Sequence, residues 1–284
     1  MTILYHYCSN RTFHSIIQNR CILLSSLSLS NDSMEGKLVA KALTKIATAD
    51  GISPCGLKQL NDALSLLENA LDAFGFCLSE EGDLLSQWRG YASDGKGVSV
   101  GFNSEYLKAL GEQQQFTLKQ VEYEDNLHSD LVKPTYLKVK ESIKNGSLNF
   151  PVRGGLLDSR TDEEIETEKR LYSKKSAEFI THILGLVPDL FRLKSRAFRE
   201  EQEWRLISHR PKEPEATNNP CKFHPGEDLI TPFKEAELKQ IYISPIKTVF
   251  LGPKNRTPLD VMKMFLCQHG LSDVSVQVSE SSYR

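Results

Sequence analysis

Hydrophobic and polar residues alternate near both ends of the chain, a pattern typical of β-strands. The N-terminal part predicts a strand (ILYHYC), a short helix (RTFHSIIQN) and a second strand (CILLSS). Later alternating runs predict further strands at FGFCLS, VSVGF, EWRLISHR, IYISPIKTVFLGPKN and VSVQVS. These runs lie before residue 124 and after residue 200, so the two ends of the chain supply the strands.

The middle of the chain has apolar residues at helical spacing instead. We expect two helices between Lys37 and Ala73, separated at DGISPCG, and a mostly helical stretch from about Asn126 to Leu193. A last helix, TPLDVMKMFLCQHG, is predicted with Thr257 as N-cap and Gly270 as C-cap. The fold class predicted is α+β: one domain, 1–284, whose mostly antiparallel, split sheet comes from both chain ends. Helical insertions are expected at about 37–73 and 126–193.

Composition narrows the class of protein. The chain has 284 residues, 39% of them hydrophobic, and a net charge of −2, which gives no overall attraction to nucleic acids or anionic membranes. No apolar run approaches the ~18 residues of a membrane span. The N-terminus lacks the pattern of a signal peptide, and the six cysteines form no CxxC pair. We therefore expect a cytoplasmic protein with reduced thiols that does not bind a membrane.

The segment EEQEWR carries the most informative pair of side chains. On a strand, Glu201 and Glu203 share a face with Cα atoms about 7 Å apart, so proximity should raise one carboxyl pKa and divide their roles. That arrangement suits a catalytic pair. The alternative is a solvated strand entrance, in which Glu203 pairs with Arg205 or Arg89.

Two further groups are candidates for ligand binding. Trp88, Arg89 and Tyr91 combine ring surfaces with a fixed cation, which can stack on a planar ring and grip a phosphate. Alternatively, Trp88 belongs to the core and Arg89 pairs with a carboxylate. His6 contacts a ribose or is a core histidine. No metal site is expected, because no second ligand pair stands near Cys221 and His224.

Five motifs in order resemble a bacterial family filed as domain of unknown function twenty-nine seventy-one. They are an L-Y-x-Y strand, an N-D-x-x-E loop, a W-R-x-Y-A segment before a glycine turn, an E-x-E-W-R strand, and L-G-P-K before the last helix. The resemblance extends from about Leu4 to His269. Ser33 departs from it, because family members usually have proline there, which implies a less rigid loop.

The motif order is also similar to that of ADP-ribosyltransferases, which hold NAD in the cleft of a split sheet. This resemblance implies that His6 grips a ribose, that Tyr91 or Trp88 stacks on nicotinamide, and that Glu203, preceded by Glu201, stabilises the ribosyl cation. Arg89 would then neutralise the pyrophosphate.

It implies an NAD-consuming transferase, of the kind found among toxins and antiphage effectors, whose acceptor is a protein or a nucleic acid. The alternative is a non-catalytic module that binds a nucleotide or a protein partner in a bacterial defence or stress system.

Overall fold

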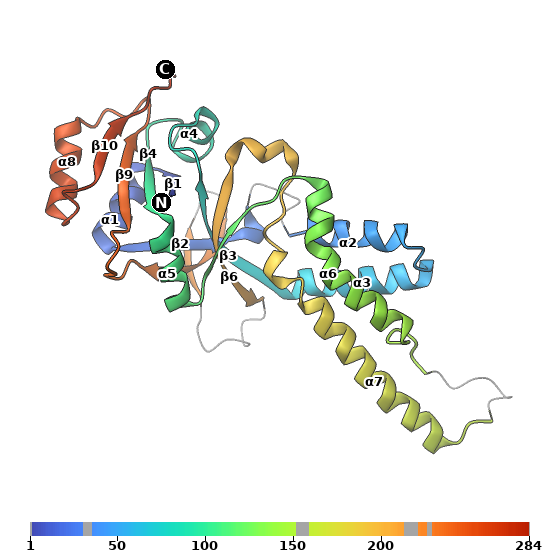
Figure 1. The fold of residues 1–284 in the computed structure, drawn as a ribbon. Coiled ribbons are helices and arrows are strands. Elements are labelled where there is room, and N and C mark those ends of the chain that lie inside the picture. Colours follow the sequence, from blue (N-terminus) through green and yellow to red (C-terminus); the bar gives the residue numbers. More distant parts are fainter. Residues whose placement is uncertain (1, 31–35, 152–158, 213–220, 226–228, 284) are drawn as a thin grey trace.

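The fold is one mixed sheet with helices packed on both of its faces (Figure 1). The structure is a computed structural model that describes residues 2–30, 36–151, 159–212, 221–225 and 229–283. The N-D-x-x-E motif, Ser33 included, lies outside these residues. None of the described helices has both the length and the apolar composition that a membrane span requires.

Ten strands of the described residues form this sheet. Their bounds are β1 Ile3–Cys8, β2 Cys21–Ser26, β3 Leu71–Ser79, β4 Val98–Asn103, β5 Thr117–Gln120, β6 Glu203–Pro211, β7 Lys222–Pro225, β8 Ile230–Glu237, β9 Ile246–Leu251 and β10 Ser275–Val278. The α-helices are α1 Asn10–Asn19, α2 Leu38–Ala49, α3 Pro54–Ala70, α4 Leu85–Tyr91, α5 Ser104–Gln114, α6 Asp125–Lys144, α7 Asp162–Leu184 and α8 Leu259–Gln268. Three short 3-10 helices are η1 Leu27–Leu29, η2 Val187–Asp189 and η3 Arg196–Glu201.

The strand order confirms that the sheet is mostly antiparallel and is built from both ends of the chain. The main path is β10-β9-β4-β1-β3-β2-β8-β7, with β6 paired to β3 and β5. Only β9 and β10 pair in parallel among the described strands. β3 and β6 are far apart in sequence, yet they pair along their whole length, from Leu71 opposite Pro211 to Ser79 opposite Glu203.

The other edge of β3 is divided between two strands. β2 pairs with its first half through Ser25–Gly75 and Ser26–Phe74, whereas β1 meets its far end through Tyr5–Ser79. In the gap between these pairings, the carbonyl of Cys77 accepts a hydrogen bond from the imidazole Nδ1 of His6 at 2.9 Å. The sheet therefore splits where β1 diverges from β2, and His6 lies at the split.

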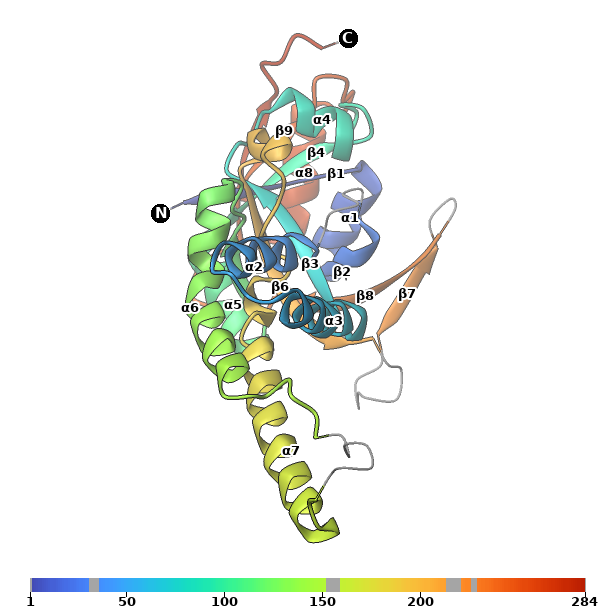
Figure 2. The same cartoon turned by 90° about the vertical axis from the view of Figure 1, so that its right-hand side faces the viewer.

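Two apolar cores lie on opposite sides of the sheet. One packs α1, α5 and α8 against strands including β1, β2 and β4. The other packs α2, α3, α6 and α7 against Ala73 of β3 and Ile207 of β6. In Figure 2 these helices lie beside β3 and β6, and α7 extends away from them. The helices predicted in the middle of the chain thus cover one side of the sheet.

Several predicted boundaries shift by one to three residues. α2 and α3 separate at the predicted break, where Ser53 accepts a hydrogen bond from the Gly56 N–H at 3.2 Å, but α3 ends at Ala70 and leaves its last predicted positions to β3. The N-cap of α8 is Pro258 rather than Thr257. The C-cap is His269 rather than Gly270, which follows it with a φ of +73°, the left-handed conformation common directly after a helix.

Candidate functional site

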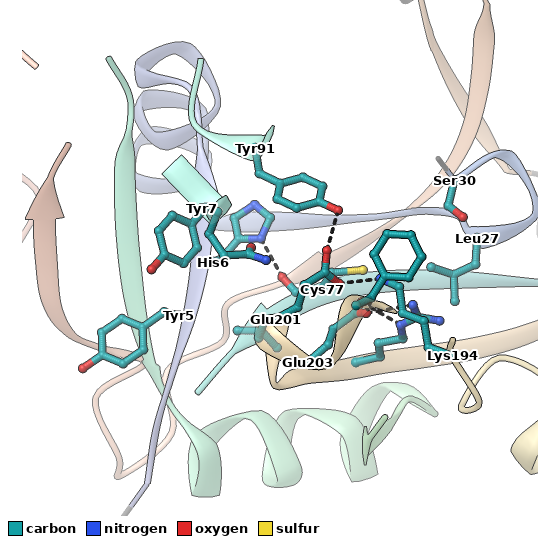
Figure 3. Close-up of a pocket in the computed structure, with 14 residues that line it drawn as sticks. Tyr5, His6, Tyr7, Leu27, Ser30, Cys77, Tyr91, Lys194, Glu201 and Glu203 are labelled. Atoms are coloured by element: carbon teal, nitrogen blue, oxygen red, sulfur yellow. Dashed lines mark hydrogen bonds and ion pairs between the residues drawn. The ribbon is translucent and has the colours of Figure 1, made fainter. Parts of the chain in front are cut away.

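A pocket of about 220 Å³ opens at the split in the sheet. Three segments distant in sequence supply most of its walls: β1, α4, and the stretch from Lys194 to Arg205 (Figure 3). The lining residues are Tyr5, His6, Tyr7, Leu27, Ser30, Cys77, Leu78, Gln87, Tyr91, Lys194, Phe198, Glu201, Glu203 and Arg205. Of the six candidate site residues predicted from the sequence, four therefore line one pocket: His6, Tyr91, Glu201 and Glu203.

Glu203 is held by two cations on the wall of this pocket. The Arg205 guanidinium donates to both carboxylate oxygens, Nε to Oε1 at 2.7 Å and NH2 to Oε2 at 2.9 Å. Lys194 donates from Nζ to Oε2 at 2.9 Å. All three residues are buried, and NH1 of Arg205 also donates to the backbone carbonyl of Phe191 at 2.9 Å. The bidentate geometry fixes the carboxylate rigidly.

This arrangement determines the charge state of Glu203. Burial would raise the pKa of its carboxyl, but Arg205 and Lys194 outweigh burial and lower that pKa to about 2. The anion is permanent at neutral pH, and its charge is already compensated by the two cations. Its ion partner is Arg205, one of the two partners considered from the sequence, and not Arg89. Glu203 therefore anchors the site rather than presenting an uncompensated negative charge.

Glu201 lines the same pocket, but it belongs to a 3-10 helix and not to the predicted strand. β6 begins only at Glu203, and Glu201 ends η3. Gln202 turns the chain between them with a φ of +42°, an uncommon value for a residue with a side chain. The Glu201 carboxylate accepts from Lys194 Nζ at 2.5 Å and from the Tyr91 hydroxyl at 3.1 Å. The two glutamates therefore both bind Lys194, but they do not lie on the same face of one strand.

Lys194 explains why two carboxylates can lie so close together. Burial would lower the pKa of its ammonium, but Glu203 and Glu201 outweigh burial and raise it. Its Nζ also lies 4.8 Å from the centre of the Phe198 ring. With Arg205, Lys194 balances the charges of the two glutamates, so the cluster as a whole is neutral.

His6 offers an unprotonated nitrogen to the pocket. Its ring stacks on Phe76 at 4.1 Å, and because Nδ1 donates to the Cys77 carbonyl, Nε2 is the acceptor nitrogen. Protein atoms surround the ring, and this burial lowers the imidazole pKa from 6.5 to about 4, although part of the ring surface still reaches the pocket. At neutral pH, Nε2 can accept a hydrogen bond from a ligand hydroxyl.

The depressed pKa of His6 predicts a pH dependence of stability. The unfolded chain binds a proton near the ordinary histidine pKa of 6.5, whereas the folded chain resists protonation until about 4. Stability should therefore be complete above the upper value and decrease as pH falls through this window. His6→Gln should flatten the slope, which urea titrations at several pH values would measure. An unchanged slope in the variant would assign the pH dependence to other groups.

Tyr91 faces the pocket, whereas Trp88 and Arg89 do not line it. Tyr91 is 45% exposed, and burial together with the Glu201 carboxylate raises its phenol pKa, so the hydroxyl remains a donor. Trp88 is fully buried, donates from its indole N–H to Asp83 at 2.6 Å and packs edge-on against Tyr7. Its ring is not available to stack on a ligand.

Arg89 lies on the exposed side of α4. Its guanidinium carbon is 5.8 Å from the centre of the Tyr283 ring, and it is not one of the residues that line the pocket. The expected grip of Arg89 on a pyrophosphate in this pocket therefore does not fit its position. The cations that do line the pocket are Lys194 and Arg205.

Several lining residues were not predicted from the sequence, among them Lys194, Gln87 and Cys77. Lys194 stands among several basic residues in FRLKSRAFRE, so its charge alone does not distinguish it. Gln87 directly precedes the Trp88-Arg89 pair, and Cys77 lies in a strand recognised only as such. Burial and the Glu203 carboxylate raise the pKa of the Cys77 thiol, which is therefore protonated at neutral pH.

Comparisons with known proteins support the family but add no activity. Residues 87–206 match the model of a family described as "Protein of unknown function (DUF2971)". Neither the curated proteins nor the solved structures gave a match. The matched segment begins at Gln87 and ends at Leu206, so it includes Tyr91, Lys194 and both glutamates of the pocket. The match supports the resemblance to this family that the sequence motifs had indicated.

Proposed function

We propose that the pocket binds NAD and transfers its ADP-ribose group to an acceptor, a protein or a nucleic acid. One observation carries this proposal. His6, Tyr91 and the Glu201–Glu203 pair, which are the residues that the ADP-ribosyltransferase resemblance requires, come from distant segments and line a single pocket at a split in the sheet. A role as a toxin or antiphage effector stays a prediction.

The reaction would break one bond and form another at the anomeric carbon of the nicotinamide ribose. The C–N bond breaks with both electrons leaving on nicotinamide, which departs as a neutral molecule. The ribose carbon becomes cationic, an acceptor oxygen or nitrogen attacks it, and the acceptor releases a proton. A fixed carboxylate next to this carbon stabilises positive charge that exists only in the transition state.

Glu201 is the better placed carboxylate for that task. Its side chain is 13% exposed, against 7% for Glu203, and among the described residues one of its oxygens is bound only by the neutral Tyr91 hydroxyl. Both oxygens of Glu203 are bound by cations. We assign to Glu201 the stabilisation of the ribosyl cation. Glu203 then has the task of holding Lys194 and Arg205 in place.

Tyr91 and His6 would orient the substrate. The exposed Tyr91 ring offers a surface on which the nicotinamide ring can stack, and Nε2 of His6 can accept from a ribose hydroxyl. The pocket, about 220 Å³, is smaller than the ~300–1,000 Å³ typical of sites for whole ligands. It would hold the nicotinamide–ribose half of NAD, with the remainder outside.

NAD binding provides the first test. At a hundred times its dissociation constant, NAD should stabilise the wild-type protein by about 2.7 kcal/mol, measured as a rise in melting temperature. Tyr91→Ala should weaken NAD binding by roughly tenfold or more through lost stacking. Tyr91→Phe, which loses only the hydroxyl bonded to Glu201, should keep that affinity. A wild-type protein whose melting temperature is indifferent to NAD would refute the proposal.

A non-catalytic nucleotide-binding module is the second candidate. The observation that favours it is the neutral cluster of two carboxylates and two cations, which resembles a structural network because every carboxylate oxygen has a partner. This candidate predicts that NAD raises the melting temperature without any release of nicotinamide. Chromatographic measurement of nicotinamide in the same samples separates the two functions.

A further inference from the structure

A second cavity lies toward the other end of the paired strands β3 and β6 from the pocket. Cys77 and Arg205, which line the first pocket, lie opposite each other near the Ser79–Glu203 end of this pair. Phe74 and Ser208, which line the second cavity, also lie opposite each other but nearer the Leu71–Pro211 end. The cavity measures about 330 Å³ and is lined by Phe74, Ser208, His209, Arg210, Pro211, Cys221, Lys222, Phe233, Lys234 and Glu235.

Lys234 enters this cavity without an anionic partner. Its Nζ lies 3.4 Å from the Ser208 hydroxyl and 4.8 Å from the centre of the Phe116 ring. No described carboxylate lies within ion-pair distance of it, in contrast to Lys194 in the first pocket. Burial without a compensating charge lowers the pKa of its ammonium. A half-buried, unpaired cation costs stability, and a bound anion would remove that cost.

Arg210 supplies a second positive charge to the same cavity. Its guanidinium carbon lies 5.3 Å from the centre of the Phe74 ring, and its Nε donates to the backbone carbonyl of Pro211 at 2.9 Å. It forms no ion pair with a described carboxylate. Lys222 and Glu235 form an ion pair at 2.6 Å, so their charges compensate each other. Burial lowers the pKa of His209, which is therefore neutral at neutral pH. Within the part of the chain that the structure describes, the positive charges of Lys234 and Arg210 therefore remain without a paired carboxylate.

We propose that this cavity, bounded by β6, β7 and β8, binds a small organic phosphate monoester through Lys234 and Arg210. A phosphate monoester carries a charge of about −1.5 to −2 at neutral pH, which matches two cations better than a carboxylate does. Arginine binds phosphate oxygens in a fork, and lysine adds a point charge. The walls formed by Phe74, Phe233 and Pro211 suit an apolar or aromatic body on the ligand, and the volume lies within the usual range for small ligands.

This site is independent of the proposed NAD chemistry. It lies toward the other end of the β3–β6 pair, and among the described residues its lining has no member in common with that of the first pocket. Figure 2 shows β7 and β8 extending from the edge of the sheet, away from α4. A phosphate ligand here would fasten the β7–β8 hairpin to β6.

Calorimetric titration with phenyl phosphate tests the proposal on the full chain. The wild-type protein should bind phenyl phosphate, and benzoate, which has the same ring but one negative charge, at least tenfold more weakly. Lys234→Met keeps the apolar stem and removes the charge, so it should weaken phenyl phosphate binding at least tenfold. Arg210→Gln should do the same. Lys263→Met, at an exposed lysine on α8, should have no effect.

A second readout separates a binding lysine from a structural one. Without ligand, Lys234→Met should melt at or above the wild-type temperature, because it removes an unpaired buried charge. Glu201→Gln, in the other pocket, should leave phenyl phosphate binding unchanged. The proposal is overturned if phenyl phosphate does not bind the wild type, if benzoate binds as tightly, or if both Lys234→Met and Arg210→Gln bind phenyl phosphate normally. Should Lys234→Met fail to fold, Arg210→Gln decides.

Discussion

Glu203→Gln is expected to lower the melting temperature by roughly 5–10 °C, the largest effect on stability of any single change considered. The neutral amide would remove the anion that binds the Arg205 guanidinium through two nitrogens, and it would leave Glu201 as the carboxylate bound to Lys194. Removing one partner of a buried pair typically costs about 3–5 kcal/mol, because the remaining charge is uncompensated. Differential scanning calorimetry on the two proteins measures the change.

The Glu203 carboxylate should also contribute to the pH dependence of stability in the acid range. Its folded pKa is about 2, below the ordinary value of 4.5, so its stabilisation is fully present above 4.5 and is lost as pH falls through about 2. The variant should lack that part of the acid dependence. Glu112→Gln, at an exposed residue of α5, serves as the matched control. If both variants melt like the wild type, the ion cluster does not stabilise the fold.

Most elements of the fold could be predicted from the sequence because each has a local signal. Hydrophobic alternation identified β1, β3 and β6, and helical spacing identified α2, α3 and α7. Boundaries were less certain, since a strand can begin where helical spacing still continues, as at Leu71. Pairing was recoverable only in outline. The sequence around β3 has no local signal for the pairing of one of its edges with both β1 and β2.

The candidate site was predictable in its residue types but not in their partners. From the sequence, Tyr91 and Trp88 are equally suited to stacking on a ligand. Their helix has only seven residues, which is too short for hydrophobic periodicity to show which of the two rings is buried. Lys194 was missed because its role depends on a fold that brings it to both glutamates. The Glu201–Glu203 spacing predicts a strand that includes both residues. In the structure Gln202 adopts a left-handed backbone conformation, which is uncommon for glutamine, and the strand therefore begins only at Glu203.

The shared lysine connects stability with the proposed chemistry. Lys194 neutralises part of the charge of both glutamates, so a change at either one alters the field at the other. Because Glu203 keeps Arg205 as a second cation, it can hold the cluster together when Glu201 is altered. The two glutamates should therefore separate experimentally: one variant should mainly lose stability and the other mainly activity.

Glu201→Gln should reduce nicotinamide release from NAD by a factor on the order of 10²–10³ while leaving the fold intact. The amide preserves the shape of the side chain and can still accept from the Tyr91 hydroxyl, but it cannot stabilise a ribosyl cation as an anion does. The melting temperature should fall much less than in Glu203→Gln, because Lys194 keeps its bond to Glu203. NAD should still raise that temperature, since the binding surfaces of Tyr91 and His6 are unchanged.

Glu200→Gln is the matched control for this prediction. Glu200 precedes Glu201 in the chain, is exposed and does not line the pocket, so its variant should release nicotinamide at the wild-type rate. Turnover is measured as nicotinamide released with cell extract as the source of acceptor, and binding is measured as the NAD-induced shift in melting temperature. Equal turnover in the Glu201 and Glu200 variants would remove Glu201 from the mechanism. A wild-type protein that binds NAD but releases no nicotinamide under these conditions would leave the non-catalytic module as the function of the pocket.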